Sequence, residues 1–531
     1  MAFVAKDLKW HVRESEVCVK IGLRFEKMIT SEEIFIMKPT YSYSCISILV
    51  FLFLVGAAPT SGIEYLIPTD STIGTWDPVS RTYTLTADVS VSIELPKPFP
   101  QLGLIKIVED NLTLDGDGHT VMNTIAGGCN GIYLYQRTDV TIKNLTVKGF
   151  YNGIFLGNSS YNTLTGVTAE DNVYWGFYLS GSSYSAVTNN IFSGNYDALV
   201  LGGGNNNVVA GNTISNNSHD GIYIFNSDNN TLIDNSICDN NIDGIAVFSN
   251  LCHNNNLIGN TVSDNTTGIY VWNDGGENTI IGNTILYNVH GIQSFVSWGN
   301  NVLADNTVSY NVTGIAMSMN RSNNTLEGNI ITNNYDYAIR LRWDCSNNTV
   351  IGNTVSDNGV GIYLLNNSND NLIYNNNFAG NTIQAYISSS NGNLFNLGKP
   401  TGGNFWSNWT SPDNDRDGFV DYPYFFIGGQ DNLPWTDKDG WLSPKAAIRG
   451  LIYEVEALNL PKGIINNLNA KLEAALRVID DLNENNNAAA VNLLEAFINA
   501  VGAQRGRNIP QEDADALIAA AQGIINQLAT E

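Results

Sequence analysis

Basic residues are scarce in this chain of 531 residues, with 26 Lys and Arg against 51 Asp and Glu and a formal net charge of −25. A nucleic-acid-binding protein needs clustered Lys and Arg to replace phosphate counterions, so this balance argues against nucleic acid as a partner. Cysteine is also sparse: the six cysteines are too few for a disulfide framework and lack the CxxC spacing of a zinc site. A single bridge between Cys238 and Cys252 remains open.

Long apolar runs are almost absent, and the one clear run, Ile46–Val55, is too short to span a bilayer. Its length and the small residues that follow it are typical of a signal peptide. If translation starts at Met37, residues 37–58 form an ordinary signal peptide, and residues 1–36 are a mis-assigned or unstructured extension. This predicts a secreted, extracellular or cell-surface protein. The alternative is an uncleaved signal anchor, which would be the only contact with a membrane.

A tetrapeptide of the form Gly-Ile-x-Leu recurs through the chain at intervals of 22 to 24 residues. It begins at Gly131, Gly153, Gly176, Gly221, Gly244, Gly268, Gly291, Gly314 and Gly361, and Ala198, Ala338 and Gln384 occupy the remaining beats. Such regularity indicates a solenoid of stacked repeats.

Each repeat holds three short apolar phrases separated by Asn, Gly and Ser, which predicts three short strands per coil. Apolar residues alternate with period two, which excludes a helical repeat, and the unit lacks the leucine pattern of a leucine-rich repeat. We therefore expect a mainly β protein, a right-handed parallel β-helix of about 12 coils over residues 121–400. Residues 63–120 would form an N-terminal cap and the first coil.

Stacking would place equivalent residues about 4.8 Å apart, so the Ile and Leu of the tetrapeptide form inward aliphatic ladders. Recurring asparagines at Asn212, Asn260, Asn283 and Asn306 are expected to bond amide to amide between coils. Sequons at Asn111, Asn144, Asn265, Asn311 and Asn408 fit a glycosylated surface.

After Ser443-Pro444, an N-cap and first-turn pair, the composition changes to Ala, Leu and Glu at helical spacing. Four amphipathic stripes predict a small all-α bundle over residues 444–531.

Two stretches resemble known families. Residues 63–440 are similar to the parallel β-helix repeat proteins grouped as carbohydrate-binding proteins and sugar hydrolases, in particular to the NosD-type branch. The similarity rests on LTLDGDGHTV, on phrases of the type NNTLxGNTI and on Gly402-Gly-Asn-Phe-Trp-Ser. The C-terminal text LIYEVEALNLPKGIINNLNAKLEAAL, with AQRGRNIP, resembles the FIMAH helical domain, which implies docking to a protein partner or a spacer role.

The NosD resemblance also implies a copper accessory role. Copper prefers clusters of His, Met or Cys, and here the histidines are scattered and Met is rare, so we discount this role.

In each Gly-Ile-x-Leu strand the x position and the residue after Leu should point outward. The expected substrate-binding residues on this outer face are Tyr178, Tyr223, Phe225, Phe248, Tyr270, Trp272, Phe295, Arg340 and Arg342. The row continues with Tyr133, Tyr135, Phe155 and Tyr363. Aromatic rows at this pitch would form a flat platform on which sugar rings stack while the arginines bond hydroxyl groups. The alternative is that this stripe packs against a loop, a glycan or the C-terminal bundle.

Asp197, Asp220 and Asp243 precede the glycine position on three consecutive coils. Neighbouring carboxylates would lie about 5 Å apart and alternate ones about 10 Å, which brackets the separations in retaining and inverting glycosidases. They are the candidate catalytic residues of a glycosidase or a lyase. The competing interpretation is that Asp is simply a common turn residue before Gly.

Residues 401–442 hold an Asp-rich loop, Asp413–Asp421, which would cap the β-helix. Its spacing matches the start of an EF-hand-type Ca²⁺ loop, with Asp413, Asp415, Asp417, the Phe419 carbonyl and Asp421 as ligands. Tyr424 stands where the closing Glu is expected, and Asp431 is a candidate substitute. No helix pair flanks the loop, which predicts a structural Ca²⁺.

The leading hypothesis is a carbohydrate- or polysaccharide-binding protein whose β-helix face holds the glycan. An enzyme is the weaker alternative and would be a glycoside hydrolase or polysaccharide lyase. A structural surface adhesin is the third.

Overall fold

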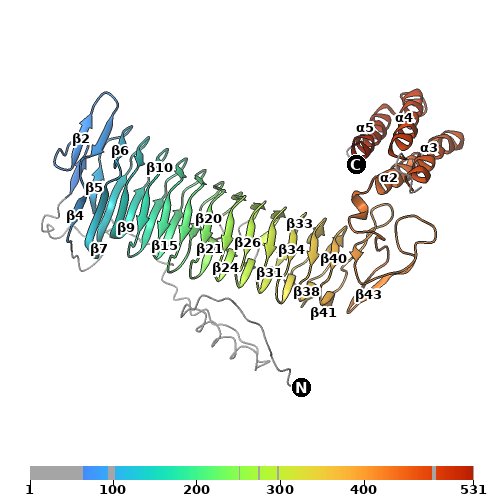
Figure 1. Ribbon diagram of the computed structural model, residues 1–531, viewed down its shortest axis with the longest axis horizontal. Helices are drawn as coiled ribbons and strands as arrows, with labels where there is room; N and C mark the ends of the chain where they lie inside the picture. The colour runs from blue at the N-terminus through green and yellow to red at the C-terminus, as the bar shows by residue number, and fades with distance from the viewer. Residues whose placement is uncertain are drawn as a thin grey trace, which may run out of the picture. The chain divides into compact units, whose positions relative to one another are not determined.

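The structure is a computed structural model that describes residues 64–93, 102–249, 251–272, 276–295, 298–480 and 486–529. From residue 64 to residue 406 the chain winds into a parallel β-solenoid whose strands stack coil upon coil (Figure 1). The expectations for residues 1–58 lie outside the described residues. Among the residues described, no helix combines the length and apolar character needed to cross a bilayer.

Most coils contribute three strands, as the three apolar phrases of the repeat predict. The first strands form one sheet: β2 (Gly74–Asp77), β3 (Thr82–Leu85), β6 (Thr113–Asp115), β8 (Thr141–Lys143), β10 (Thr163–Thr165), β13 (Ala186–Thr188), β16 (Val208–Ala210), β19 (Thr231–Ile233), β22 (Asn256–Ile258), β25 (Thr279–Ile281), β29 (Val302–Ala304), β33 (Thr325–Glu327), β36 (Thr349–Ile351) and β39 (Leu372–Tyr374).

The second strands form another stack: β4 (Val89–Val91), β11 (Thr168–Glu170), β14 (Ile191–Ser193), β17 (Thr213–Ser215), β20 (Ser236–Cys238), β23 (Thr261–Ser263), β26 (Thr284–Leu286), β30 (Thr307–Ser309), β34 (Ile330–Thr332), β37 (Thr354–Ser356), β40 (Asn377–Ala379) and β42 (Phe405–Trp406).

The third strands carry the Gly-Ile-x-Leu phrase: β1 (Tyr65–Ile67), β5 (Gly103–Ile107), β12 (Trp175–Ser180), β15 (Asp197–Gly202), β18 (Ile222–Phe225), β21 (Asp243–Phe248), β24 (Thr267–Trp272), β27 (His290–Phe295), β31 (Thr313–Ser318), β35 (Tyr337–Arg342), β38 (Val360–Leu365) and β41 (Ile383–Ser388). In two early coils, β7 (Thr120–Tyr135) and β9 (Thr146–Gly157) run through the second and third positions without a break.

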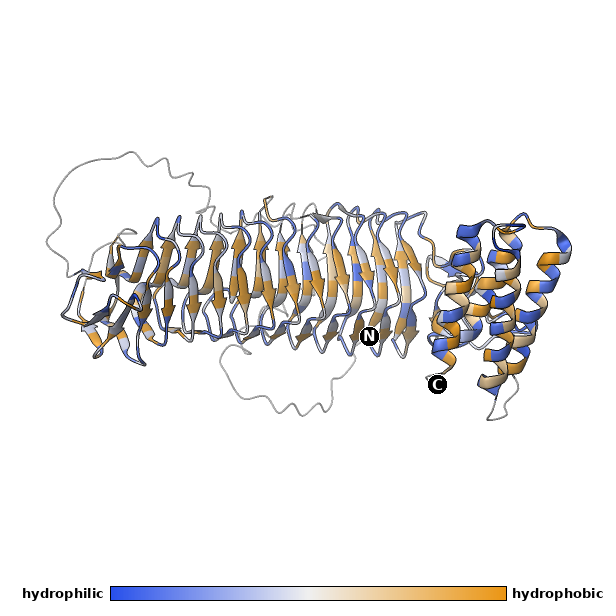
Figure 2. Ribbon diagram, turned by 90° about the horizontal axis from the view of Figure 1, so that it is seen from above, coloured by the Kyte–Doolittle hydropathy of each residue, from blue (hydrophilic) through white to orange (hydrophobic). Residues whose placement is uncertain are grey.

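The register confirms the aliphatic ladders. Ile222 pairs with Ile245 and Ile245 with Ile269, and all three side chains are fully buried. In Figure 2 the hydrophobic colour of the strands gives way to hydrophilic turns. Close stacking also explains the glycine before each Ile, because a Cβ on Gly221 would come within 2.5 Å of the carbonyl oxygen of Gly244.

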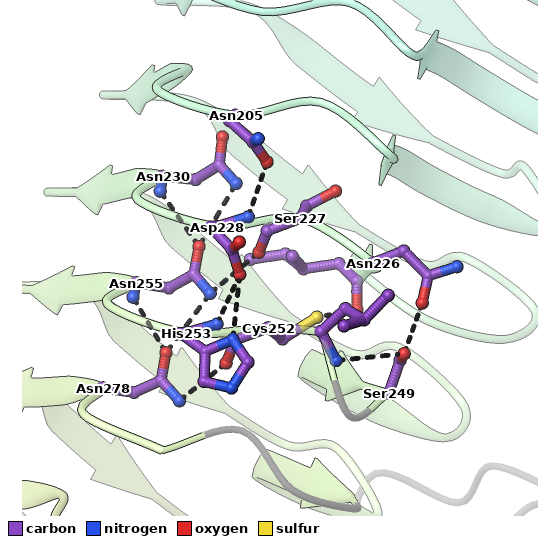
Figure 3. A network of polar contacts seen from close by, with 12 residues as sticks. Asn205, Asn226, Ser227, Asp228, Asn230, Ser249, Cys252, His253, Asn255 and Asn278 are labelled. Atoms are coloured by element: carbon purple, nitrogen blue, oxygen red, sulfur yellow. Dashed lines mark hydrogen bonds and ion pairs between the residues drawn. The ribbon is translucent and has the colours of Figure 1, made fainter.

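The asparagine ladders are confirmed and more extensive than predicted. The Asn260 amide donates to Asn283 Oδ1 (3.0 Å), and Asn283 donates to Asn306 Oδ1 (3.0 Å). Each Oδ1 also accepts the backbone N–H of the asparagine one coil earlier, as at Asn260 N (2.9 Å). A parallel ladder runs through Asn230 and Asn255 (Figure 3). These amides satisfy turn backbone groups that would otherwise be buried without partners.

The solenoid begins with irregular strands and ends in a loop-rich segment. The hairpin of β2 and β3 pairs antiparallel at the N-terminal end. At the other end, β42 adds to the last coil and the hairpin of β43 (Tyr424–Phe426) and β44 (Gly429–Asp431) follows. A small parallel pair, β28 (Trp298–Gly299) and β32 (Arg321–Ser322), lies outside the main sheets.

A short 3₁₀ helix, η1 (Gly440–Leu442), leads into four α-helices, as the amphipathic stripes predict. They are α2 (Pro444–Ala457), α3 (Lys462–Asp480), α4 (Asn486–Gln504) and α5 (Gln511–Leu528). Ser443 caps α2 by accepting the backbone N–H of Ala446 (3.1 Å), with Pro444 in the first turn. The helices share a core that includes Ile448, Leu472 and Phe497.

Among the described residues the free cysteines are Cys129, Cys238, Cys252 and Cys345, so the bridge left open between Cys238 and Cys252 is not formed.

Candidate functional site

The third strands from β12 to β41 present one outer surface, which we call the long-strand face. Burial alternates along most of these strands, although β15, β21 and β31 are buried almost throughout. In β18, for example, Ile222 and Ile224 are buried while Tyr223 and Phe225 are half-buried. The same alternation places Arg340 and Arg342 of β35 outside. The predicted inward and outward positions are therefore confirmed.

Aromatic rings follow one another along the long-strand face. Phe248 and Trp272 lie 5.7 Å apart between ring centroids with planes 12° from parallel, and Trp272 and Phe295 lie 5.4 Å apart at 18°. Tyr223 joins this row beside Phe248 (6.0 Å), and Tyr270 joins it beside Trp272 (6.0 Å). The row spans four consecutive coils.

The row does not form the flat platform that its spacing predicted. Two coplanar rings cannot approach to 5.4 Å between centroids without overlap of their edges, so Trp272 and Phe295 overlap face over face with an offset. The surface is therefore ribbed, with ring edges outward. It also has gaps: Val200 and Ala246 occupy the x position on intervening coils and are covered by larger neighbours.

Three aspartates, Asp197, Asp220 and Asp243, stand in one column. Asp197 begins β15, Asp220 lies two residues before β18, and Asp243 begins β21. Their exposed fractions are only 5%, 3% and 7%. The Asp220 N–H donates to Asp197 Oδ1 (3.1 Å), and the Asp243 N–H donates to Asp220 Oδ1 (3.1 Å). The carboxylates thus form a ladder like that of the asparagines, but one that carries charge.

His219 closes this ladder, and sequence reasoning did not identify it. Its Nδ1 lies 2.8 Å from Asp197 Oδ1 and 3.1 Å from Asp220 Oδ2. Trp175 Nε1 donates to the other oxygen of Asp197 (3.2 Å). We call Asp197, His219, Asp220 and Asp243 the charged cluster. Because the carboxyl groups are covered and 31% of the His219 side chain is exposed, the imidazole is the group that a ligand on the surface would meet.

The protonation of the charged cluster follows from burial and pairing. Burial alone would lower the pKa of His219, but hydrogen bonds and charge from Asp197 and Asp220 outweigh it and raise the pKa to about 10. Burial raises the pKa of Asp220 and, with the nearby charge of Asp220, raises that of Asp243 well above its ordinary value. At neutral pH an imidazolium therefore lies against Asp220, whose carboxyl group holds its proton more tightly than an ordinary Asp.

A spacing signal could have revealed His219. Tyr151, Tyr174 and Tyr196 precede it at intervals of 22 and 23 residues, and their rings stack at 5.4 Å and 5.1 Å. The His219 ring continues the column at 4.6 Å from Tyr196. This second aromatic column lies outside the x position and the residue after Leu, the two outward positions considered in the repeat.

Arg340 and Arg342 lie toward the other end of the face. Four coil steps separate β35 from β21, which is about 19 Å, so the arginines do not join the charged cluster. Arg340 Cζ lies 5.1 Å from the Tyr337 ring, and Arg342 Cζ lies 4.1 Å from the Trp343 ring.

The Asp-rich loop gathers three of its predicted ligands. Ligand oxygens of Asp413, Asp415 and Asp417 lie within 4.8 Å of one another. Asp421 instead accepts hydrogen bonds from Asn414, and Lys399 pairs with Asp417.

Asp431 cannot serve as the closing ligand. It is fully buried and accepts from Asn404 N (2.7 Å) and Trp406 Nε1 (2.9 Å), away from the loop. Burial raises its pKa to about 6.

Two family profiles match adjoining parts of the solenoid. Residues 130–285 match "Right handed beta helix region", and residues 290–411 match "Periplasmic copper-binding protein (NosD)". The chain is thus a right-handed β-helix repeat protein, and the fold class expected from its sequence is confirmed. The FIMAH resemblance of the helices remains a prediction. No curated protein sequence matches the chain.

Several solved structures are similar to this chain at low sequence identity. The A-module of mannuronan C-5 epimerase AlgE6 from Azotobacter vinelandii is 14% identical, with 59% of this chain and 88% of that chain covered and a TM-score of 0.46. The GH87 alpha-1,3-glucanase of Streptomyces thermodiastaticus is 15% identical (60% and 62% covered, TM-score 0.38). PfbA, a surface adhesin of Streptococcus pneumoniae, is 12% identical (59% and 80%, TM-score 0.30).

The copper role in the name of one matching profile finds little support in the residues here. Within the described chain, neither cluster of three or more metal-type side chains contains a second histidine. Soft or imidazole-rich ligand sets are what copper selects.

Proposed function

We propose that this protein binds a polysaccharide along the long-strand face, outside the cytoplasm. One observation carries the proposal: a row of half-buried aromatic side chains crosses four consecutive coils between ionisable groups at either end. The folded core does not require this row, because the same strands already bury their inward Ile and Val ladders. Outward aromatic surface of this extent is typical of a binding surface.

The chemistry of the row suits a sugar chain. Ring edges carry partial positive charge and ring faces partial negative charge, so a ribbed aromatic surface offers edges to hydroxyl oxygens and partial faces to sugar C–H groups. A linear array of similar positions, one every about 4.8 Å, suits a repeating polymer more than a compact ligand.

The test is binding to a polysaccharide panel by wild type and by Trp272→Ala. We expect Trp272→Ala to lose at least tenfold in affinity, which corresponds to about 1.4 kcal/mol. The matched control is Tyr287→Ala, because Tyr287 stacks on Tyr310 at 5.2 Å in a turn outside the long-strand face. Equal losses in the two variants, or no polysaccharide bound by wild type, would contradict the proposal. The second result would leave a structural adhesin as the better interpretation.

The charged cluster supports a second candidate function, cleavage or modification of the bound glycan. His219 is the exposed member and would exchange the proton, while Asp197 and Asp220 would orient it and stabilise its charge. Direct action of the aspartates as paired glycosidase carboxylates remains a prediction, and their burial favours the indirect role.

The Asp220→Asn variant distinguishes binding from cleavage, because it removes the carboxylate but keeps the oxygen that accepts the Asp243 N–H. Polysaccharide binding that survives in this variant supports the binding function alone. New reducing or unsaturated ends that wild type produces and Asp220→Asn does not would establish the enzyme. Asp228→Asn, which alters an exposed His253–Asp228 pair at 3.3 Å, is the control.

We also propose that the Asp-rich loop holds a structural Ca²⁺ through Asp413, Asp415, Asp417 and the Phe419 carbonyl. Three gathered carboxylates support this, and Lys399 would have to leave Asp417 or share it with the ion. The helices α2 to α5 remain a candidate docking module for a protein partner.

A further inference from the structure

Arg340 and Arg342 carry positive charge that the protein does not neutralise. Neither guanidinium pairs with a carboxylate within the part of the chain that the structure describes. Their contacts are aromatic, with Tyr337 and Trp343, apart from one hydrogen bond from Arg342 Nε to Ser318 Oγ (3.0 Å). In a protein of net charge −25, two adjacent unpaired arginines on one strand are exceptional.

Two buried nitrogen atoms at this place have no hydrogen-bond partner among the described residues: Nε of Arg340 and Nδ1 of His290. His290 lies on β27, two coil steps from β35 in the same face. On the intervening strand β31, Thr313 pairs with His290, and Ala316 and Ser318, which pair with Arg340 and Arg342, are small and fully covered. An unsatisfied buried donor is costly, so the site is incomplete without an acceptor.

The positive charges of Arg340 and Arg342 affect the pKa values of their neighbours. Burial, together with the charges of Arg340 and Arg342, lowers the pKa of His290 to about 4. Burial and the neighbouring Arg340 also lower the pKa of Arg342 to about 10. Asp336 is the carboxylate whose charge acts on Arg340, with Tyr337 and Tyr363 as the other titratable neighbours. The balance is positive, which favours an anion.

We propose that Arg340, Arg342 and His290 form an anion subsite that takes the carboxylate or sulfate group of an acidic polysaccharide. Guanidinium groups bind such oxyanions through charge-assisted hydrogen bonds, and the Arg340 Nε would gain its missing partner. Tyr337, Tyr363 and Tyr386, with ring centroids 5.2 Å and 5.1 Å apart on successive coils, would line the path of the sugar chain. The inference rests on the proposed binding function and specifies its ligand class.

The two ends of the aromatic row differ in charge. At the β15–β21 end the accessible group is the His219 ring, and the β35 end offers two arginines. An acidic chain would therefore be held by its anionic groups at the arginine end, because His219 at the other end is already paired with Asp197 and Asp220 and the protein as a whole repels polyanions. Binding should weaken as salt concentration rises, since the attraction is local and partly exposed.

The test is calorimetric binding of polygalacturonate against its methyl ester, and of dextran sulfate against dextran. We expect wild type to prefer at least one acidic form, and the polymer preferred identifies carboxylate or sulfate as the anion. Arg340→Gln and Arg342→Gln should each lose at least tenfold in affinity for that polymer and little for its neutral form. Arg477→Gln is the control, because its side chain is 70% exposed on α3. Thermal unfolding of each variant verifies that it is folded.

Equal binding of acidic and neutral polymers, unchanged in Arg340→Gln, would overturn the anion subsite and leave the proposed binding function standing. A second arm needs no polysaccharide: sodium sulfate at constant ionic strength should raise the Tm of wild type more than that of the Arg340→Gln/Arg342→Gln variant. The variant corrects for the general stabilisation by sulfate. If no polymer binds but this difference is present, the proposed function fails and the anion subsite remains; if the difference is absent as well, both fail.

Discussion

His219 is the residue on which the stability of the charged cluster should depend. His219→Gln removes the positive charge and leaves Asp197 and Asp220, whose side chains are 7% and 4% exposed, facing each other. Loss of one partner of a fully buried ion pair costs about 3–5 kcal/mol. Since 31% of the His219 side chain is exposed, solvent screening reduces the expected loss to about 1–3 kcal/mol at pH 7.

The loss should depend on pH in a defined direction. The pKa of His219 is raised from its ordinary 6.5 to about 10 in the folded protein, so the folded state holds this proton more tightly. The stabilisation is fully present below pH 6.5 and is lost as the pH rises toward 10. The difference in unfolding free energy between wild type and His219→Gln should therefore shrink between pH 7 and pH 10.

Denaturant unfolding, followed by circular dichroism at pH 6, 8 and 9.5, measures this difference. Hydrogen exchange over β15, β18 and β21 locates it, because coils of a solenoid can open locally. His253→Gln is the control, since the His253–Asp228 pair is 39% and 36% exposed. The reasoning is refuted if His219→Gln is no less stable than His253→Gln at pH 7, or if the difference does not shrink at high pH.

Three further outcomes follow from other parts of the structure. Asn283→Ala leaves the Asn260 N–H and the Leu257 carbonyl without their partner and should cost about 2–4 kcal/mol in denaturant unfolding, whereas the exposed Asn241→Ala should cost under about 0.5 kcal/mol. In a glycosylating host, mass spectrometry should find glycan at Asn111, Asn144 and Asn408, which are exposed, but not at Asn265 or Asn311, because the amides of these two are buried in a ladder; occupancy at either would contradict it. Ca²⁺ should raise the Tm of wild type but not of Asp415→Asn, and an equal shift in both would remove the metal from this loop.

The interior of the solenoid could be predicted because every coil repeats one pattern. The 22- to 24-residue interval fixes which residues stack, so the partners of Ile245 and Asn283 follow from the sequence alone. A period of two then decides which side chains face the core. The start of α2 was also readable, because Ser443 and Pro444 are local signals.

The outer face could be predicted in position but not in conformation. The register places Trp272 beside Phe295, but whether the rings lie flat or overlap depends on side-chain torsions that the sequence does not specify. His219 was missed because its partners, Asp197 and Asp220, lie on different coils and its own column had not been aligned. Arg340 was expected to bond hydroxyl groups, because the sequence gives no sign that its Nε is buried without a partner.

The column that contains the carboxylates supplies its own comparison. Three and two coils before Asp197 the same position holds Asn130 and Asn152, whose amides bond to each other (2.8 Å). Asn152 Oδ1 also accepts the Trp175 N–H (3.4 Å), the role that Asp197 Oδ1 has toward Asp220. A neutral amide therefore meets the backbone requirement, and the charge of Asp197, Asp220 and Asp243 adds desolvation cost without adding a backbone contact.

The fold alone thus explains an oxygen at these positions but not a carboxylate. Replacing all three aspartates by Asn should leave the unfolding free energy within about 1 kcal/mol of wild type, since each Oδ1 remains and the buried charge is gone. The same variant should return the pKa of His219, measured by NMR, toward or below its ordinary value, because burial would then act unopposed. If the triple Asn variant instead unfolds while His219→Gln is stable, the carboxylates are required for folding. The proposed surface function of the charged cluster would then be contradicted.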